Sequence, residues 1–500
     1  MAKLKKLGTI GVVLVIFSTV SGFANPNIAY YKMGYAAIPW YILSAICFFI
    51  PFTFMIAEYG SSFKDSGGGM YTWMRESIGP LYGFIGTFMW YSSYVVYMMA
   101  TSIKIWIPTS EFLFGADTTQ NWSFLGLDSN KFIGILAMMF MVVVTFFATR
   151  GFNKISFVAS VGGTAVLLIN LSLYIISIII FILNKGQIAQ PIEDISSFVH
   201  SPNSEYQSVF SLIAFMTFAL FAYGGVENMG SIVEKTKSIS KFVKGVILAT
   251  ILISLCYALS IFCFGISSNW NVLSETDGVN MGNIVYVLMG NLGFEFGNAL
   301  GLSTDISLIL SSWFSRITAL VMLMAYMGAF FVLIYSPLKS LLYGAPEGMW
   351  PKALVKNNKF NMPGKIMWVQ TIFICILIAI ISFGGQGAKS FYNILILLSN
   401  VAQTFPYFFI VAAFIKFRNN NEINHDFKIV KSKIFVYIMT FTVSLVILFA
   451  NIFTIINPLL IGDEEALSQT IWMIAGPVLF LCIALLIYYN YKRRIKKLNK

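Results

Sequence analysis

Two short segments interrupt long apolar stretches with residues that favour a broken helix. Segment 21–26 reads SGFANP, and segment 221–227 reads FAYGGVE. A break frees backbone groups: N–H groups at the start of a helix favour an anion, and carbonyl groups at an end favour a cation. Close packing through small residues would explain either segment by itself. Together the two breaks suit a small solute that carries both charges.

One acidic residue lies directly after the second break. Inserting a carboxylate such as Glu227 into an apolar span costs roughly 2.5–3.5 kcal/mol, which marks it as a functional candidate. We interpret Glu227 as a candidate for proton coupling. The alternative is a carboxylate that ties down the broken helix by hydrogen bonds. Lys104 is interpreted as an anchor at the membrane interface, and Glu58 as a structural or inner-gate residue. For Arg316 two interpretations stay open, an interfacial anchor and a partner for a carboxylate or the substrate.

Other kinds of site lack the residues they would need. All five cysteines lie in apolar runs without a CxxC pair, and the two histidines, His200 and His425, lie in polar loops. We therefore predict no metal site and no cofactor. No cluster of carboxylates, histidines or a nucleophile suggests an enzyme, and no repeated polar stripe suggests a channel.

The composition places these breaks in a membrane. The 500 residues are 58% hydrophobic and 11% charged, with a mean hydropathy of +0.78. A soluble domain is about 45–50% apolar and roughly 25% charged. We predict an all-α integral membrane protein forming a single transmembrane domain over 1–500. The predicted spans are 8–33, 38–59, 82–110, 131–149, 156–183, 208–233, 242–268, 306–343, 366–384, 389–415, 433–456 and 470–490.

The basic residues define a topology. Most of the 33 lysines and arginines fall in the N-terminal tail, in alternate loops and in the tail 491–500, while the opposite loops are polar and acidic. The positive-inside rule predicts that both termini are cytoplasmic in the plasma (inner) membrane. The net charge of +12 is thereby explained without a nucleic-acid partner. The first apolar run is too long for a cleaved signal peptide.

The positions of the breaks suggest a repeat. The first opens a block of five spans over 8–184, and the second opens a block of five over 207–417. An odd number of crossings gives the second block the inverted orientation. Interrupted helices at matching places in inverted halves indicate a transporter's binding site. Two further spans, over 433–490, follow.

Three motifs carry a family resemblance. The segments AEYG at 57–60, GGGMY at 67–71 and GP at 79–80 resemble the span 2–3 signature of the amino acid–polyamine–organocation (APC) transporter superfamily. The resemblance covers nearly the whole chain and is closest to the glutamate/γ-aminobutyrate antiporter branch. It implies a LeuT-like fold with 12 transmembrane helices, a 5+5 inverted repeat plus two C-terminal helices.

The resemblance also implies roles for residues at both breaks. Backbone groups of Ser21, Gly22 and Phe23 would hold a substrate carboxylate, and groups of Ala222, Tyr223 and Gly224 would hold the amine. Phe221 and Phe330 match aromatic gates, and Glu227 matches a carboxylate linked to pH response. Span 5 has Gly-Gly-Thr at 162–164 where some proton-coupled relatives have a lysine, which leaves the coupling open.

We therefore expect a secondary active transporter that moves amino acids or related zwitterions by alternating access, as an antiporter or a proton-coupled permease. The alternative is a polyamine or organocation carrier. The expected partners are the lipid bilayer, an amino-acid-like substrate and a proton, with the oligomeric state open.

Overall fold

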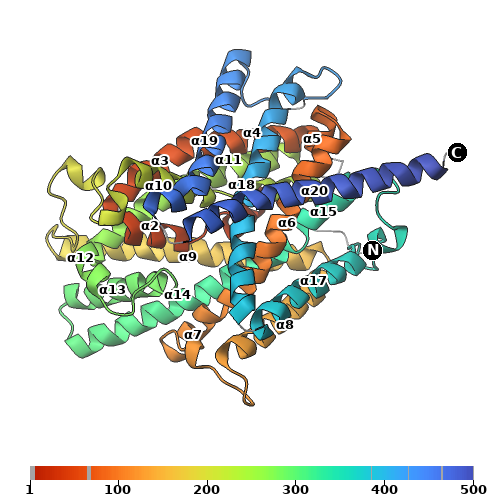
Figure 1. The fold of residues 1–500 in the computed structure, drawn as a ribbon. Helices are drawn as coiled ribbons and strands as arrows, with labels where there is room; N and C mark the ends of the chain where they lie inside the picture. Colours follow the sequence, from red (N-terminus) through yellow and green to blue (C-terminus); the bar gives the residue numbers. More distant parts are fainter. Residues whose placement is uncertain (1–5, 65–68, 385, 426, 463–464, 499–500) are drawn as a thin grey trace.

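The computed structural model describes residues 6–64, 69–384, 386–425, 427–462 and 465–498, and they form one bundle of helices (Figure 1). The described residues contain no β-strand beyond two isolated bridges. Nine described segments are long and apolar enough to cross a membrane. Helices also occupy the other predicted spans, but they are not among these nine segments. The count of twelve spans therefore stays a prediction.

The helices follow one another along the chain with short connections. Their bounds are α1 Thr9–Thr19, α2 Ala24–Met33, α3 Ala37–Ser44, α4 Ile50–Ser62, α5 Gly69–Ser77, α6 Pro80–Lys104, α7 Trp106–Phe114, α8 Ser129–Ala148, α9 Phe152–Leu183, α10 Val209–Phe221, α11 Ile239–Ser267, α12 Trp270–Glu275, α13 Ile284–Ala299, α14 Thr304–Leu333, α15 Ser336–Gly344, α16 Lys352–Val355, α17 Gly364–Phe383, α18 Gln386–Asn419, α19 Lys433–Ile461 and α20 Ala466–Leu498. A π-helical turn at Ala45–Phe49 joins α3 to α4, and a 3-10 helix, η6, runs over Val226–Lys235. Further 3-10 turns lie at Gly34–Ala36, Thr119–Asn121, Ile195–Phe198 and Ser204–Tyr206.

Both predicted breaks are present. The helix stops between α1 and α2, and Pro26 lies in the first turn of α2. A proline there needs no N–H acceptor, but its ring would clash with the carbonyl four residues back in a continuous helix. The second break lies between α10 and η6, where Gly225 has a φ of +116°. Side chains strongly disfavour this conformation, so glycine is needed at this position.

Several boundaries differ from the sequence prediction, and the span predicted over 82–110 is divided between α6 and α7. The span predicted over 306–343 is divided, because α14 ends at Leu333 and Pro337 lies in the first turn of α15. The segment 61–80, predicted as a loop, contains α5. The tail 491–500, predicted as a short basic run, continues α20 to Leu498.

Serine residues cap the N-termini of α10, α11, α14 and α19. In each helix the serine hydroxyl accepts a hydrogen bond from a backbone N–H of the first turn, and the residues are Ser208, Ser238, Ser303 and Ser432.

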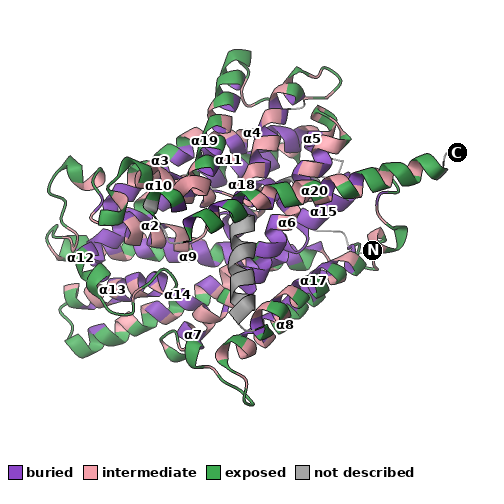
Figure 2. Cartoon of the chain, viewed as in Figure 1, coloured by how far each residue is buried: buried purple, intermediate pink, exposed green. Residues whose placement is uncertain are grey.

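The bundle is apolar on its outside as well as in its core. Buried residues gather where helices face one another, and exposed residues lie on outward surfaces of α8, α17 and α20 (Figure 2). Those outward surfaces carry exposed large hydrophobic side chains, among them Phe146, Ile376 and Leu486. Such surfaces suit lipid rather than water.

Two adjacent glycines of α9 let three helices meet at their backbones. A Cβ on Gly162 would lie 2.6 Å from the Met324 carbonyl oxygen of α14. A Cβ on Gly163 would lie 2.0 Å from the Leu14 carbonyl oxygen of α1. Small residues allow this close approach in membrane bundles. The Gly-Gly pair of span 5 therefore holds α1 and α14, two helices of the central cavity described below, against α9.

Gly163→Ala should separate α1 from α9. Because the added methyl group meets backbone rather than a movable side chain, we expect a loss of at least about 2 kcal/mol in unfolding free energy, in the range of overpacking. The measurement is thermal denaturation of the purified protein in detergent. Gly8→Ala is the control, since nothing lies within 4 Å of its added Cβ. Equal melting temperatures for the two variants would contradict this packing role.

Candidate functional site

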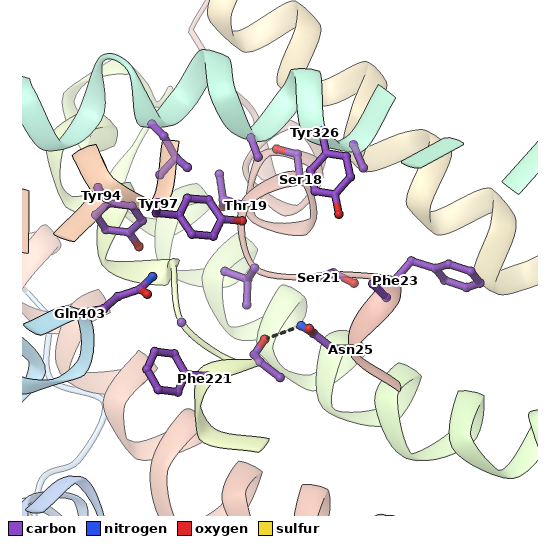
Figure 3. A pocket seen from close by; sticks show the side chains of 18 of the residues that line it. Ser18, Thr19, Ser21, Phe23, Asn25, Tyr94, Tyr97, Phe221, Tyr326 and Gln403 are labelled. Atoms are coloured by element: carbon purple, nitrogen blue, oxygen red, sulfur yellow. Dashed lines mark hydrogen bonds between the residues drawn. The ribbon is translucent and has the colours of Figure 1, made fainter. Parts of the chain in front are cut away.

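A cavity of about 300 Å³ lies between the two breaks, α6, α14 and α18 (Figure 3). Figure 3 shows Ser21 and Asn25 on one side of it and Tyr94, Phe221 and Gln403 on the other. Its lining residues are Ser18, Thr19, Val20, Ser21, Gly22, Phe23, Ala24, Asn25, Tyr94, Tyr97, Phe218, Phe221, Ala222, Gly224, Met322, Ala325, Tyr326, Ala329, Leu333, Gln403 and Tyr407. The volume suits a small solute of amino-acid size.

Among the residues whose side chains the structure describes, none that lines this cavity is charged. Its polar side-chain groups are neutral hydroxyls and amides, such as those of Thr19, Tyr326 and Gln403. Any charge that enters must therefore be met by backbone groups and helix ends. Neutral dipoles of this kind hold a balanced pair of charges better than a net charge.

The start of α2 offers the groups that suit a carboxylate. The Ser21 N–H donates to the Phe17 carbonyl at 3.1 Å, and the Gly22 N–H lies 3.0 Å from the Tyr257 hydroxyl. The N–H groups of Phe23 and Ala24 have no acceptor among the described residues. They lie at the positive end of the α2 dipole. Of the three residues expected to hold a carboxylate, Phe23 therefore has an available N–H group, and Ala24 adds a second, whereas the N–H groups of Ser21 and Gly22 already have acceptors.

The negative dipole ends at the cavity come from two helix C-termini. Both α1 and α10 end at the cavity, so their negative dipole ends meet there. Within the described chain, no donor reaches the backbone carbonyl oxygens of Thr19 and Ser21. These carbonyls suit an ammonium group. The positive end of α2 and the negative ends of α1 and α10 therefore share one small cavity.

A tyrosine on α11 joins the two breaks. The Tyr257 hydroxyl oxygen lies 2.9 Å from the carbonyl oxygens of both Val20 and Ala222. It also accepts from the Gly22 N–H at 3.0 Å and from Asn25 Nδ2 at 3.2 Å. Because it contacts backbone of both breaks, Tyr257 fixes their separation. The sequence carries no signal for this residue, which lies mid-helix among apolar neighbours.

Glu227 lies behind the cavity wall and is only 1% exposed. Its Oε1 accepts bonds from Trp90 Nε1 at 3.1 Å, Tyr94 Oη at 2.8 Å and Tyr407 Oη at 3.0 Å. Its Oε2 accepts from the Gly225 N–H at 3.0 Å. Tyr94 and Tyr407 also line the cavity. Glu227 thus holds the second break in place and is separated from the cavity by two tyrosine hydroxyls.

The structure brings most of the predicted site residues together. Ser21, Gly22, Phe23, Phe221, Ala222 and Gly224 all line the cavity. Tyr223 does not: its ring is buried against Phe49, and its hydroxyl donates to the Tyr41 carbonyl at 3.2 Å. Phe330 does not line it either, because its ring packs edge-on against Phe140 of α8. Ala329 and Tyr326 face the cavity instead.

Two other charged residues of the spans serve as structural contacts. Glu58 Oε2 forms a buried ion pair with Arg418 Nη1 at 2.7 Å. Arg316 Nη1 donates to the Leu113 carbonyl of α7 at 3.2 Å, and Arg316 does not line the cavity.

Comparison with known proteins identifies the family of the chain. The amino acid permease family model matches residues 7–486. The chain is 47% identical to the inner membrane transporter YjeM of Escherichia coli, over 99% of this chain and 98% of that protein. It is 23% identical to the aspartate/glutamate permease AcaP of Lactococcus lactis, over 86% and 83% of the two chains. It is also 22% identical to a glutamate/γ-aminobutyrate antiporter of that species, over 91% and 84%.

Solved structures support the fold. The manganese transporter of Eremococcus coleocola superposes with a TM-score of 0.56 at 12% identity, over 97% of this chain and 94% of that one. At this identity the likeness concerns the fold alone, and it confirms the expected all-helical, LeuT-like architecture. With a family model that spans nearly the whole chain and a full-length relative at 47% identity, the chain belongs to the amino acid permease family of membrane transporters.

Proposed function

We propose that the protein transports a zwitterionic amino acid with an uncharged side chain by alternating access around the central cavity. The observation that carries this proposal is that helix ends of opposite dipole sign meet at a cavity whose described lining residues include no charged side chain. The N–H groups of Phe23 and Ala24 would hold the carboxylate, and the carbonyls of Thr19 and Ser21 the ammonium. Phe221 would cover the bound solute as an aromatic gate.

The same cavity argues against the alternative of a polyamine carrier. A diamine brings two positive charges, and no acidic side chain among the described lining residues balances the second. An acidic side chain on the substrate would likewise meet no lysine or arginine among them. Burying an ion without a partner costs several kcal/mol. We therefore expect a substrate preference different from the one in the name of the aspartate/glutamate permease.

The test is binding and counterflow with a panel of solutes. We expect neutral amino acids to raise the melting temperature of the purified protein and to exchange in vesicles. Glutamate, lysine and linear diamines should bind at least about tenfold more weakly, equivalent to 1.4 kcal/mol. A matched variant, Gln403→Glu, adds one negative charge to the cavity and should improve lysine binding relative to neutral amino acids. Stronger binding of charged solutes to the unmodified protein would refute the neutral substrate.

We also propose that Glu227 couples transport to protons through the hydroxyls of Tyr94 and Tyr407. Both hydroxyls bond to Oε1 and line the cavity, so they connect the carboxylate with the transported solute. The tyrosine hydroxyls can reverse their bonds and accept when Glu227 holds a proton.

Glu227→Gln keeps the shape of the side chain but removes its ionisation. We expect the rate of uptake by this variant to be nearly independent of pH between about 5 and 8. The rate of uptake by the unmodified protein should change with pH over the same range. Lost hydrogen-bond geometry should also cost about 1–3 kcal/mol of stability. Glu111→Gln is the control, because Glu111 is a buried carboxylate that accepts from the Ser315 hydroxyl and does not line the cavity. An unchanged pH profile in Glu227→Gln would remove the coupling role.

A further inference from the structure

A second concave surface lies where α18 ends and α19 begins, and it shares no residue with the central cavity. This pocket, of about 90 Å³, is lined by Ile415, Arg418, Asn419, Lys428, Lys431, Lys433, Val436 and Tyr437. Three of its residues are lysines with exposed side chains. None of the described residues that line it is acidic.

The charge of these lysines is uncompensated within the described chain. Lys428, Lys431 and Lys433 form no ion pair with any acidic side chain that the structure describes. The fourth positive residue, Arg418, is already paired with Glu58. Three ammonium groups around a small hollow favour an anion with several oxygen atoms, such as a phosphate.

Buried hydrogen bonds fix the segment that carries two of the lysines. Glu58 Oε1 accepts from the backbone N–H groups of Ile429 and Val430 at 2.8 and 3.2 Å. Arg418 Nη2 donates to the Val430 carbonyl at 2.6 Å. On the opposite wall, Asn419 Nδ2 donates to the Tyr437 hydroxyl at 2.9 Å. The pocket is therefore formed before any ligand binds, which lowers the entropic cost of binding.

The pocket borders an apolar surface that suits acyl chains. Directly after Lys433, α19 exposes Ile434 at 73% and, two turns on, Phe441 at 68%. Phe435 and Ile438 on the same turns are also exposed. Figure 1 shows this end of α19 beside the end of α18, at the margin of the bundle. In a membrane protein such a boundary between lysines and exposed apolar residues marks the level of the lipid headgroups.

We propose that this pocket binds the phosphate headgroup of an anionic phospholipid whose acyl chains lie along α19. The lysines bind the headgroup, and the exposed residues of α19 contact the chains. A free phosphate would use the lysines but gain nothing from the apolar surface. The proposal does not depend on which solute the central cavity carries.

The test is a lipid titration of the delipidated full-length protein in detergent, with the melting temperature as readout. Phosphatidylglycerol should raise the melting temperature more than the same mole fraction of phosphatidylcholine. Each lysine near an anionic headgroup contributes about fivefold in affinity. The triple variant Lys428→Gln, Lys431→Gln, Lys433→Gln should therefore bind phosphatidylglycerol at least tenfold more weakly (about a hundredfold if the three act independently). The corresponding triple arginine variant should retain binding.

Two controls distinguish binding at this pocket from a general attraction of anionic lipid to the protein surface. The triple variant Lys352→Gln, Lys356→Gln, Lys359→Gln removes the same charge from another exposed segment and should keep the phosphatidylglycerol effect. An equal loss in both glutamine variants would show general surface attraction and overturn the proposal. Inorganic phosphate that stabilises as much as phosphatidylglycerol would overturn it too, as would equal shifts with the two lipids. If the triple variant does not fold, Lys431→Gln alone should weaken binding about fivefold.

Discussion

Tyr257→Phe should loosen both broken helices at once. The lost hydroxyl contacts the carbonyls of Val20 and Ala222 and the N–H of Gly22, and all three lie at the cavity. A buried polar group left without a partner costs about 1–3 kcal/mol. We expect a loss of roughly 2–4 kcal/mol in unfolding free energy and at least a tenfold loss in substrate affinity. Thermal denaturation and binding of the preferred amino acid measure the two effects.

Tyr174→Phe is the matched control for this effect. The Tyr174 hydroxyl is also largely buried and contacts the Cys256 carbonyl and Ser260 of α11, at 3.0 Å each. It lies away from both breaks and does not line the cavity. Removing it should reduce stability but leave substrate affinity unchanged. If Tyr257→Phe behaved in the same way, Tyr257 would be a packing residue and not the group that positions the breaks.

Gly225→Ala should displace the two breaks from one another. With a φ of +116°, Gly225 has a backbone conformation that strains any side chain by about 1–3 kcal/mol. Its added Cβ would also lie 2.6 Å from the Thr19 carbonyl oxygen, at the end of α1. The clash can be relieved only by moving the carbonyl that we assign to the ammonium. We expect uptake to fall at least tenfold, measured in vesicles at equal protein content.

Gly462→Ala is the matched control, because it introduces backbone strain without a steric clash. Gly462 has a φ of +77°, but nothing lies within 4 Å of its added Cβ. This variant should lose about 1–2 kcal/mol of stability from strain alone and keep its transport rate. Equal uptake by the two variants would show that the contact between Gly225 and Thr19 does not shape the site.

The proposed lipid pocket and the central cavity share helix α18, which carries both Arg418 of the pocket and Tyr407 of the cavity. Glu58, near the end of α4, pairs with Arg418 next to the pocket wall. A bound headgroup would therefore stabilise a helix that also forms the binding site. This places the membrane surface within reach of the transport cycle through a single helix.

The sequence by itself determined the membrane class, the family and the position of both breaks. These features are local: apolar runs of sufficient length, and glycine or proline at the residues where a helix cannot continue. The family resemblance carried by short motifs named six residues that line the cavity. The sequence also singled out Glu227, because an acidic residue in an apolar span stands out by composition alone.

Only the tertiary structure decided which face of each helix meets the cavity. A helix surrounded partly by lipid is apolar on every side, so no amphipathic pattern tells the inner face from the outer. Phe330, which the family resemblance implied as an aromatic gate, does not line the cavity, whereas Tyr326 and Ala329 do. Tyr257 could not be recognised at all, because its role comes from two backbone segments more than thirty residues away in the chain, at 3 Å or less. Contacts of that kind exist only once the helices have packed.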